Sequence, residues 1–203
     1  MIPWRTFLLT IKRNQTKADT TLGLLRSQGM QAEVFYGVDS QITGLWTDHL
    51  YEIDAPGSGY RQGPRTVNLH LSHFLMWKVF SYLAEDAFLV LEDDVRLIPT
   101  WNDELETALT HLPADWDLFY LGSCCCKGNA GNELIWGRLC RVRRALCTHA
   151  YAVRKKALPL LIEKGEKVWA PCDILLALDC MPHLNCYAML PRIAEQLDTV
   201  IAE

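Results

Sequence analysis

Residues 88–98 read Phe-Leu-Val-Leu-Glu-Asp-Asp-Val-Arg-Leu-Ile, an apolar run that ends abruptly in three acids. The run is short and lacks polar alternation, which is typical of a β-strand buried on both faces. Glu92, Asp93 and Asp94 would repel one another unless a cation or hydrogen-bond donors compensate their charge. Since open α/β sheets bind ligands outside the carboxyl ends of their strands, the stretch predicts an α/β fold with an acidic ligand site. The alternative is a solvated acidic turn.

The three acids also suggest which ligand the site would take. Hard divalent cations such as Mn2+ or Mg2+ are held by one or two carboxylates together with the oxygens of a substrate diphosphate. We therefore expect Mn2+ (or Mg2+) and a phosphorylated substrate at this strand end.

Apolar periodicity on both sides of the acidic stretch supports an α/β fold. Strands are expected at residues 6–11, 31–36 and 117–121 and two more within 138–153, with helices at 15–28, 68–83, 100–112 and 155–164 and after Pro171. The opening strand, helix and strand form a β-α-β unit, as in nucleotide-binding sheets. Helix 68–83 is expected to bury Leu71, Leu75, Val79 and Leu83. Residues 39–65 and 122–133 lack periodicity and predict loops.

Length and composition exclude several classes of protein. The 203 residues, 50% hydrophobic and 22% charged, suit one globular domain spanning residues 1–203. The net charge of −4 and the lack of a long basic run argue against nucleic acid as a partner. No segment is long enough for a membrane span, and the first apolar run is too short for a signal peptide. We therefore expect a cytoplasmic protein, with at most peripheral association at the inner face of the membrane.

The eight cysteines form no C-x-x-C pair and no zinc-finger spacing. Without a secretory signal, most of them are expected to be small buried hydrophobic residues. A disulfide or a cysteine metal site is the less favoured alternative.

Seven short segments, in order along the chain, resemble glycosyltransferase family 25, which contains lipopolysaccharide-type bacterial glycosyltransferases and collagen galactosyltransferases. The segments are residues 10–13 (Thr-Ile-Lys-Arg), 35–39 (Phe-Tyr-Gly-Val-Asp), 71–77 (Leu-Ser-His-x-x-x-Trp), 91–95 (Leu-Glu-Asp-Asp-Val), 117–122 (Asp-Leu-Phe-Tyr-Leu-Gly), 148–151 (Thr-His-Ala-Tyr) and 171–173 (Pro-Cys-Asp). Residues 65–69 depart from the Gly-Glu-x-Gly-Cys stretch that the family usually carries, and Thr10 replaces an asparagine.

The resemblance implies a GT-A type fold, a Rossmann-like mixed sheet flanked by helices. Residues 1–123 would form the nucleotide-sugar half and residues 124–203 the acceptor half. The implied activity is that of an inverting, metal-dependent hexosyltransferase. It would move a hexose, galactose first among the candidates, from a UDP-sugar to a saccharide or lipid-linked glycan acceptor, as in lipopolysaccharide or surface glycan biosynthesis.

The resemblance also assigns roles on the donor side. Asp94 would ligate the metal, and Asp93 and Glu92 would contact the ribose or the metal's hydration shell. Arg13 and Asp39 would meet the nucleotide. For Arg13 a role as a surface arginine is an equal alternative.

On the acceptor side, an inverting transferase needs a base for the acceptor hydroxyl. Asp173 is the first candidate, with a helix cap as its alternative role. His149 is the second candidate, because the unperturbed pKa of histidine suits proton transfer, and a structural histidine is the alternative.

Two other functions remain open at this point. Nucleotidyl or phosphoryl transfer also uses acidic strand ends and a divalent metal, but the chain lacks a phosphate-binding Gly-x-x-x-x-Gly-Lys-Ser/Thr loop. The other open function is that of a degenerate, non-catalytic member of the same fold that binds a sugar or a partner. The altered residues 65–69 favour it, whereas the intact acidic triplet argues against it.

Overall fold

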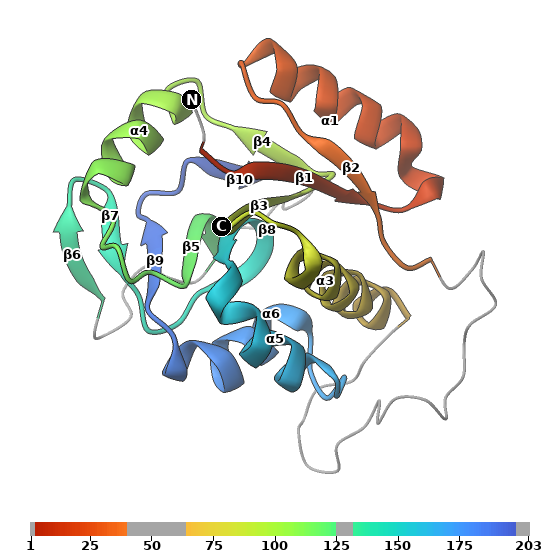
Figure 1. Ribbon diagram of the computed structural model, residues 1–203. Helices are drawn as coiled ribbons and strands as arrows, with labels where there is room; N and C mark the ends of the chain where they lie inside the picture. Colours follow the sequence, from red (N-terminus) through yellow and green to blue (C-terminus); the bar gives the residue numbers. More distant parts are fainter. Residues whose placement is uncertain (1–2, 40–63, 125–131, 198–203) are drawn as a thin grey trace, which may run out of the picture.

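A computed structural model describes residues 3–39, 64–124 and 132–197 of the chain (Figure 1). The loop expected at residues 39–65 lies almost entirely outside this description, as does most of the loop expected at 122–133. None of the helices in the described ranges is long and apolar enough to cross a lipid bilayer.

The fold is built on a mixed eight-stranded sheet in the order β2-β1-β3-β8-β5-β9-β7-β6. Its strands are β1 (Arg5–Thr10), β2 (Glu33–Tyr36), β3 (Ala87–Glu92), β5 (Leu118–Cys124), β6 (Glu133–Trp136), β7 (Leu139–Arg141), β8 (Leu146–Arg154) and β9 (Cys186–Met189). β1 runs parallel to β2 and β3, whereas β8 is antiparallel to both of its neighbours, β3 and β5. A two-stranded sheet pairs β4 (Val95–Leu97) with β10 (Ala194–Gln196).

Helices cover both faces of the sheet (Figure 1). They are α1 (Gln15–Ser27), α3 (Pro64–Tyr82), α4 (Trp101–His111), α5 (Leu158–Gly165) and α6 (Cys172–Leu175), with 3-10 turns η1 (Lys12–Asn14), η2 (Lys155–Ala157) and η4 (Met181–His183) and a π-helical turn η3 (Leu176–Cys180). Alternate strand residues divide into two cores. Phe88 and Val90 of β3 pack with α3, α5 and α6, whereas Leu89 and Leu91 pack with α1 and α4. The predicted α/β class, with a mixed sheet flanked by helices, is confirmed.

The prediction for the buried face of α3 is wrong for Leu75 and Val79, although Leu83 is partly buried and packs against the core. Leu75 and Val79 remain 43% and 42% exposed, whereas Met76, Trp77 and Phe80 are fully buried. The inner stripe of α3 also carries His70 and His73, which are both buried and hydrogen-bonded. Because polar residues occupy inner positions, the leucine and valine spacing marks a neighbouring stripe of the helix.

Gly122 was expected to open a loop, but it lies inside β5, which continues to Cys124. The register of β5 against β8 shifts at this glycine. A Cβ atom at Gly122 would lie 2.2 Å from His149 Nε2 and 2.5 Å from the backbone oxygen of Ala194. The absence of a side chain therefore allows β8 and β10 to approach β5 closely.

This contact gives a stability prediction. We expect Gly122→Ala to lower the free energy of unfolding by about 1–3 kcal/mol, because the backbone of β10 would have to shift. Gly23→Ala is the matched control: Gly23 lies on the exposed side of α1, where a Cβ atom would have no neighbouring atom within 4 Å. The control should stabilise the protein by up to about 1 kcal/mol through helix propensity. Urea unfolding of both variants tests the contrast, and equal effects would contradict it.

Candidate active site

A cavity of about 730 Å³ opens at the carboxyl ends of the parallel strands β1 and β3. It is lined by Leu9, Thr10, Ile11, Arg13, Asn14, Lys17, Val38, Arg65, Asn68, Leu69, Ser72, Glu92, Asp93, Asp94 and Gln196. The structure therefore brings four predicted site residues, Arg13, Glu92, Asp93 and Asp94, to one cavity. Its volume lies in the range of small-molecule sites.

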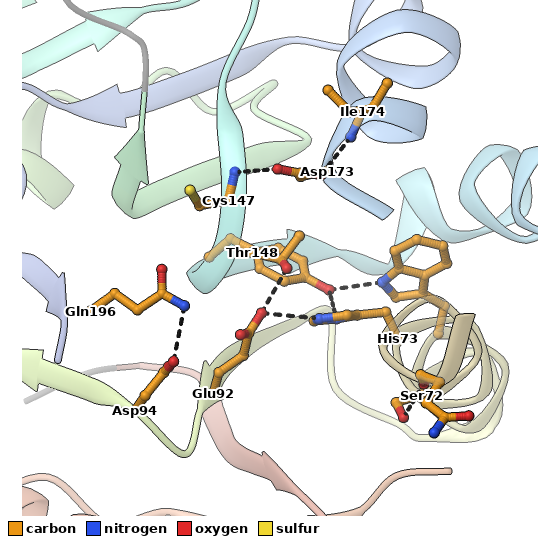
Figure 2. A network of polar contacts seen from close by, with 12 residues as sticks. Ser72, His73, Glu92, Asp94, Cys147, Thr148, Asp173, Ile174 and Gln196 are labelled. Carbon is orange, nitrogen blue, oxygen red and sulfur yellow. Dashed lines mark hydrogen bonds and ion pairs between the residues drawn. The ribbon is translucent and has the colours of Figure 1, made fainter. Parts of the chain in front are cut away.

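Asp94 is the most unusual of the three acids. Its side chain is buried, with 5% exposed, and Oδ2 accepts one hydrogen bond of 2.9 Å from Gln196 Nε2 (Figure 2). Oδ1 is buried and has no hydrogen-bond partner among the described residues. Burial raises the pKa of Asp94, and the charges of Glu92 and Asp93 add to this effect, while Gln196 and Lys17 oppose it. A buried carboxylate oxygen without a donor is costly unless a cation satisfies it.

Asp93, in contrast, is held by protein donors. Its Oδ2 accepts hydrogen bonds from Thr10 Oγ1 at 2.6 Å and from Asn14 Nδ2 at 3.2 Å. Lys17 Nζ lies 3.3 Å from Oδ1. These contacts tie the end of β3 to the end of β1 and to the start of α1. Thr10 thus has a definite role as a donor to Asp93.

Glu92 ends β3 and is held from the opposite side of the sheet (Figure 2). Its Oε1 accepts hydrogen bonds from Thr148 Oγ1 at 2.6 Å and from His73 Nε2 at 3.3 Å. Burial works to raise the pKa of Glu92, but the hydrogen bonds from His73 and Thr148 and the nearby histidines outweigh it, so the pKa lies below its ordinary value. Glu92 is therefore an ionised carboxylate with fixed orientation at the cavity wall.

Two buried aromatic residues fix the orientation of His73. Trp77 Nε1 donates to Tyr151 Oη at 2.9 Å, and Tyr151 Oη lies 3.0 Å from His73 Nδ1. Because the indole N–H can only donate, the hydroxyl hydrogen of Tyr151 is available for Nδ1. His73 then carries its proton on Nε2 and donates it to Glu92. This series of hydrogen bonds explains why His73 and Trp77 lie one turn apart on α3.

Ser72 connects α3 to the segment that follows β2. Its Oγ donates to the backbone oxygen of Asn68 at 2.6 Å and accepts from Val38 N at 2.8 Å. A Cβ atom at Gly37 would lie 2.3 Å from this oxygen, so only glycine permits the contact. Asp39 follows, is buried, and lies 2.7 Å from Arg13 Nε through Oδ2. Asp39 itself does not line the cavity but holds Arg13, which does.

The two candidate bases lie away from the cavity lining. Asp173 sits in the first turn of α6, where Oδ2 accepts from Cys147 N at 3.0 Å and Oδ1 from Ile174 N at 2.9 Å (Figure 2). His149 is fully buried on β8, with Nε2 3.2 Å from the backbone oxygen of Ala194. Burial lowers the pKa of His149. Asp173 contacts Cys147, and His149 follows Thr148 in β8. Both candidate bases therefore lie on the side of Glu92 that faces β8.

The cysteines partly follow the prediction. Cys140, Cys172, Cys180 and Cys186 are buried, as expected. Cys124 and Cys147 form a disulfide between β5 and β8, which was the less favoured alternative. The two residues are 23 positions apart in the chain, and only the pairing of β5 with β8 brings them side by side. Cys125 and Cys126 lie outside the described residues.

The acidic triplet fits a divalent cation. Asp94 Oδ1 lacks a donor, Glu92 presents an ionised carboxylate, and both lie at the cavity where a diphosphate would supply further oxygens. Asp93 differs, because its two oxygens already contact Thr10, Asn14 and Lys17. The residues that could hold the metal are therefore Asp94 first and Glu92 second.

Sequence reasoning missed the groups that hold these acids in place. They are Thr10, Asn14, Lys17, Trp77, Thr148, Tyr151 and Gln196. Trp77, Thr148 and Tyr151 belong to the motifs that resemble the family, so a search for buried polar partners of Glu92 could have found them. Gln196 offers no such signal, since it comes 102 residues after Asp94 in the chain.

Known glycosyltransferases are similar to this chain in sequence. No protein-family model matches the chain. Procollagen galactosyltransferase 2 of Mus musculus is 27% identical over 125 residues, which cover 57% of this chain and 20% of that protein. Procollagen galactosyltransferase 1-B of Xenopus laevis is 30% identical and a glycosyltransferase 25 family member of Aedes aegypti 26% identical, with the same shares covered. The chain thus spans about one fifth of the length of these relatives, and the predicted resemblance to glycosyltransferase family 25 is confirmed at low identity.

The solved structures that match the chain include two glycosyltransferases. GlyE of Streptococcus pneumoniae TIGR4 superimposes with a TM-score of 0.47 at 12% identity, covering 92% of this chain and 45% of that one. A glycosyltransferase involved in the glycosylation of the major capsid of PBCV-1 gives a TM-score of 0.40 at 14% identity, covering 77% and 62%.

Proposed function

We propose that this chain, which resembles glycosyltransferase family 25, is a metal-dependent hexosyltransferase. It would bind a UDP-sugar with Mn2+ or Mg2+ and transfer the hexose, galactose first among the candidates, with inversion. The acceptor would be a saccharide or lipid-linked glycan, as in lipopolysaccharide or surface glycan biosynthesis. The chain would act in the cytoplasm, at most peripherally on the inner face of the membrane. The observation that carries the proposal is Asp94 Oδ1, a buried oxygen beside Glu92 at the cavity that has no hydrogen-bond partner among the described residues.

The donor side of the cavity suits a nucleoside diphosphate. Asp94, with Glu92, would hold the cation, which when bound supplies Lewis-acid stabilisation for the charge that develops on the departing diphosphate. Arg13, Lys17 and Arg65 also line the cavity and offer positive charge for phosphate oxygens. Asp93 and Asp39 act in this proposal by holding Lys17 and Arg13 toward the nucleotide.

The acceptor side requires a base for direct displacement at the sugar carbon. Asp173 and His149 are the proposed candidates, whereas Glu92 is assigned to the cation. Two backbone N–H donors, those of Cys147 and Ile174, hold the carboxylate of Asp173 in place. Comparing Asp173→Asn with His149→Gln separates the two. The variant that lacks the base should lose transfer to the acceptor while it keeps Mn2+-dependent UDP binding.

The proposal is tested by incubating the purified protein with a panel of UDP-sugars, with Mn2+ or with EDTA, and measuring released UDP. We expect slow release from one UDP-hexose with Mn2+ and none with EDTA. No release, but UDP binding that needs Mn2+, would indicate a transferase that requires its acceptor. Release of pyrophosphate from UTP with a sugar phosphate would instead favour nucleotidyl transfer. If the protein showed no turnover and no UDP binding, the transferase proposal would be refuted and the non-catalytic alternative would be favoured.

A further inference from the structure

Beside the proposed donor site lies a second group of potential metal ligands. Cys124 at the end of β5 and Cys147 and His149 on β8 each offer one ligand atom, and the three atoms lie within 4.8 Å of one another. A tetrahedral zinc ion places two thiolate sulfurs roughly 3.8 Å apart, given Zn–S bonds of about 2.3 Å. The three side chains therefore converge closely enough for a zinc-type site once the disulfide between the two sulfurs is opened.

His149 provides an independent indication of a ligand. It is 0% exposed, and its Nε2 lies 3.2 Å from the backbone oxygen of Ala194, an atom that can only accept. Nε2 must therefore carry the proton, which leaves a lone pair on Nδ1. Nδ1 is buried and has no hydrogen-bond partner within the part of the chain that the structure describes. A histidine that donates one N–H to a carbonyl and presents the other nitrogen is the usual arrangement in metal sites.

The two cysteines are joined as a disulfide in the structure, so the same sulfurs cannot bind a metal in that state. We propose that Cys124, Cys147 and His149 form a redox-dependent site for a soft divalent metal of the zinc class. The disulfide state binds no ion, and the dithiol state binds one through two sulfurs and His149 Nδ1. This inference does not depend on the transferase proposal.

The chemistry balances with one co-reactant. A dithiol reductant supplies two electrons and two protons and becomes a disulfide, while the S–S bond of the protein breaks into two thiols. A phosphine does the same with one water molecule, which supplies the two protons and the oxygen of the phosphine oxide. The divalent ion then displaces those two protons and forms two metal–sulfur bonds. Two thiolates and a neutral imidazole balance the charge of the ion, which suits the partly buried position. Three protein ligands leave one of four tetrahedral positions open.

The position of this cluster links it to the cavity. Thr148, between Cys147 and His149, donates the 2.6 Å hydrogen bond to Glu92. Cys147 adopts a positive φ of 68°, which is uncommon for a residue other than glycine, and its N–H is held by Asp173. A conformation of this kind persists where the surroundings hold it in place. A change of bonding at Cys147 therefore acts one residue away from a donor to Glu92.

The test uses the full chain with Cys125 and Cys126 replaced by serine, so that these neighbours do not compete for the ion. The protein is reduced with a phosphine, freed of reductant without oxygen, and titrated with Co2+ alone as a spectroscopic probe. We expect one Co2+ per chain with thiolate-to-cobalt charge-transfer absorption, which Zn2+ then displaces. The oxidised protein should show no such absorption. Co2+ at the carboxylates of the cavity cannot produce this band, so the two sites are distinguished.

Variants locate the site. Cys147→Ser and His149→Gln should each lose or strongly weaken the thiolate–cobalt band, whereas Cys186→Ser, a buried free thiol on β9, should keep it. Circular dichroism confirms that each variant is folded. In the protein that keeps Cys124, Cys147 and His149, Zn2+ should also protect the two cysteines from alkylation by iodoacetamide. Peptide mass mapping measures this protection. A reduced, folded protein without the band, or a band that survives in the Cys124→Ser/Cys147→Ser double variant, would overturn the proposal.

Discussion

Asp94→Asn is expected to lower Mn2+-dependent turnover by at least about 100-fold, because loss of the main metal ligand removes several kcal/mol of charge stabilisation. The same variant should make the metal-free protein more stable, by about 1–2 kcal/mol. The neutral amide removes a buried charge that lies beside Glu92 and Asp93 and has an oxygen without a donor. Its carbonyl oxygen can still accept from Gln196. Activity and stability thus move in opposite directions.

The pH dependence of stability follows from the raised pKa of Asp94. Because the folded protein holds this proton more tightly than the unfolded chain, stability falls as the pH rises from the ordinary value of 3.8 through the raised pKa. We therefore expect the gain from Asp94→Asn to be small in acid and complete above the raised pKa. Urea unfolding of EDTA-treated protein across this range measures it.

Asp19→Asn is the control for Asp94→Asn. Asp19 is an exposed aspartate on α1 whose replacement removes one negative charge outside the cavity. It should change neither turnover nor the pH dependence of stability appreciably. If Asp94→Asn kept full Mn2+-dependent turnover, or destabilised the metal-free protein, the assignment of Asp94 as a metal ligand would be wrong.

His73→Ala is expected to lower the free energy of unfolding by about 2–4 kcal/mol. The substitution leaves a cavity in a fully buried place and removes the partner of Tyr151 Oη and one of the two donors to Glu92. Loss of the His73 hydrogen bond should also raise the pKa of Glu92 toward or above its ordinary value. As the pH is lowered, turnover should then begin to fall at a higher pH than in the unmodified protein.

His73→Gln separates packing from hydrogen bonding. The glutamine amide can place an N–H where His73 Nε2 donates to Glu92, but it does not reproduce the acceptor for Tyr151. We expect this variant to recover the acidic limb of the pH–rate profile while it remains less stable than the unmodified protein. If His73→Ala left both the profile and the stability unchanged, the orienting role of the Trp77, Tyr151 and His73 chain would be refuted.

The elements that sequence predicts best are those whose local pattern and packing agree. The apolar run of β3 ends in acids because the strand is buried on both faces while its carboxyl end opens to a cavity. The helix after Thr100 and the strand from Leu118 follow the same logic, with regular apolar spacing and abrupt ends. The acidic triplet can therefore be located from local sequence pattern alone.

The predictions that fail share one physical cause, which is contact between segments that are far apart in the chain. On α3, His73 and Trp77 turn inward because Tyr151 and Glu92 lie opposite them, and hydrophobic spacing alone cannot reveal this. Gly122 continues a strand because His149 and Ala194 approach it from distant segments. The disulfide between Cys124 and Cys147 likewise depends on the pairing of β5 with β8.

The three acids illustrate the same limit at the site. Their sequence positions are adjacent, yet Glu92 contacts β8 and α3, Asp93 contacts β1 and α1, and Asp94 contacts β10. Sequence assigns all three to the donor site. The structure separates Asp94, whose Oδ1 has no donor among the described residues, from Asp93, whose two oxygens are both engaged.

The central claim is that a divalent cation at Asp94 binds a nucleoside diphosphate in this cavity. Calorimetric titration of UDP into the EDTA-treated protein, with and without added Mn2+, tests it most directly. We expect saturable binding with Mn2+, none with EDTA, and loss of the Mn2+-dependent binding in Asp94→Asn. UDP binding that is equal in Mn2+ and EDTA, or Mn2+-dependent binding that persists in Asp94→Asn, would contradict it.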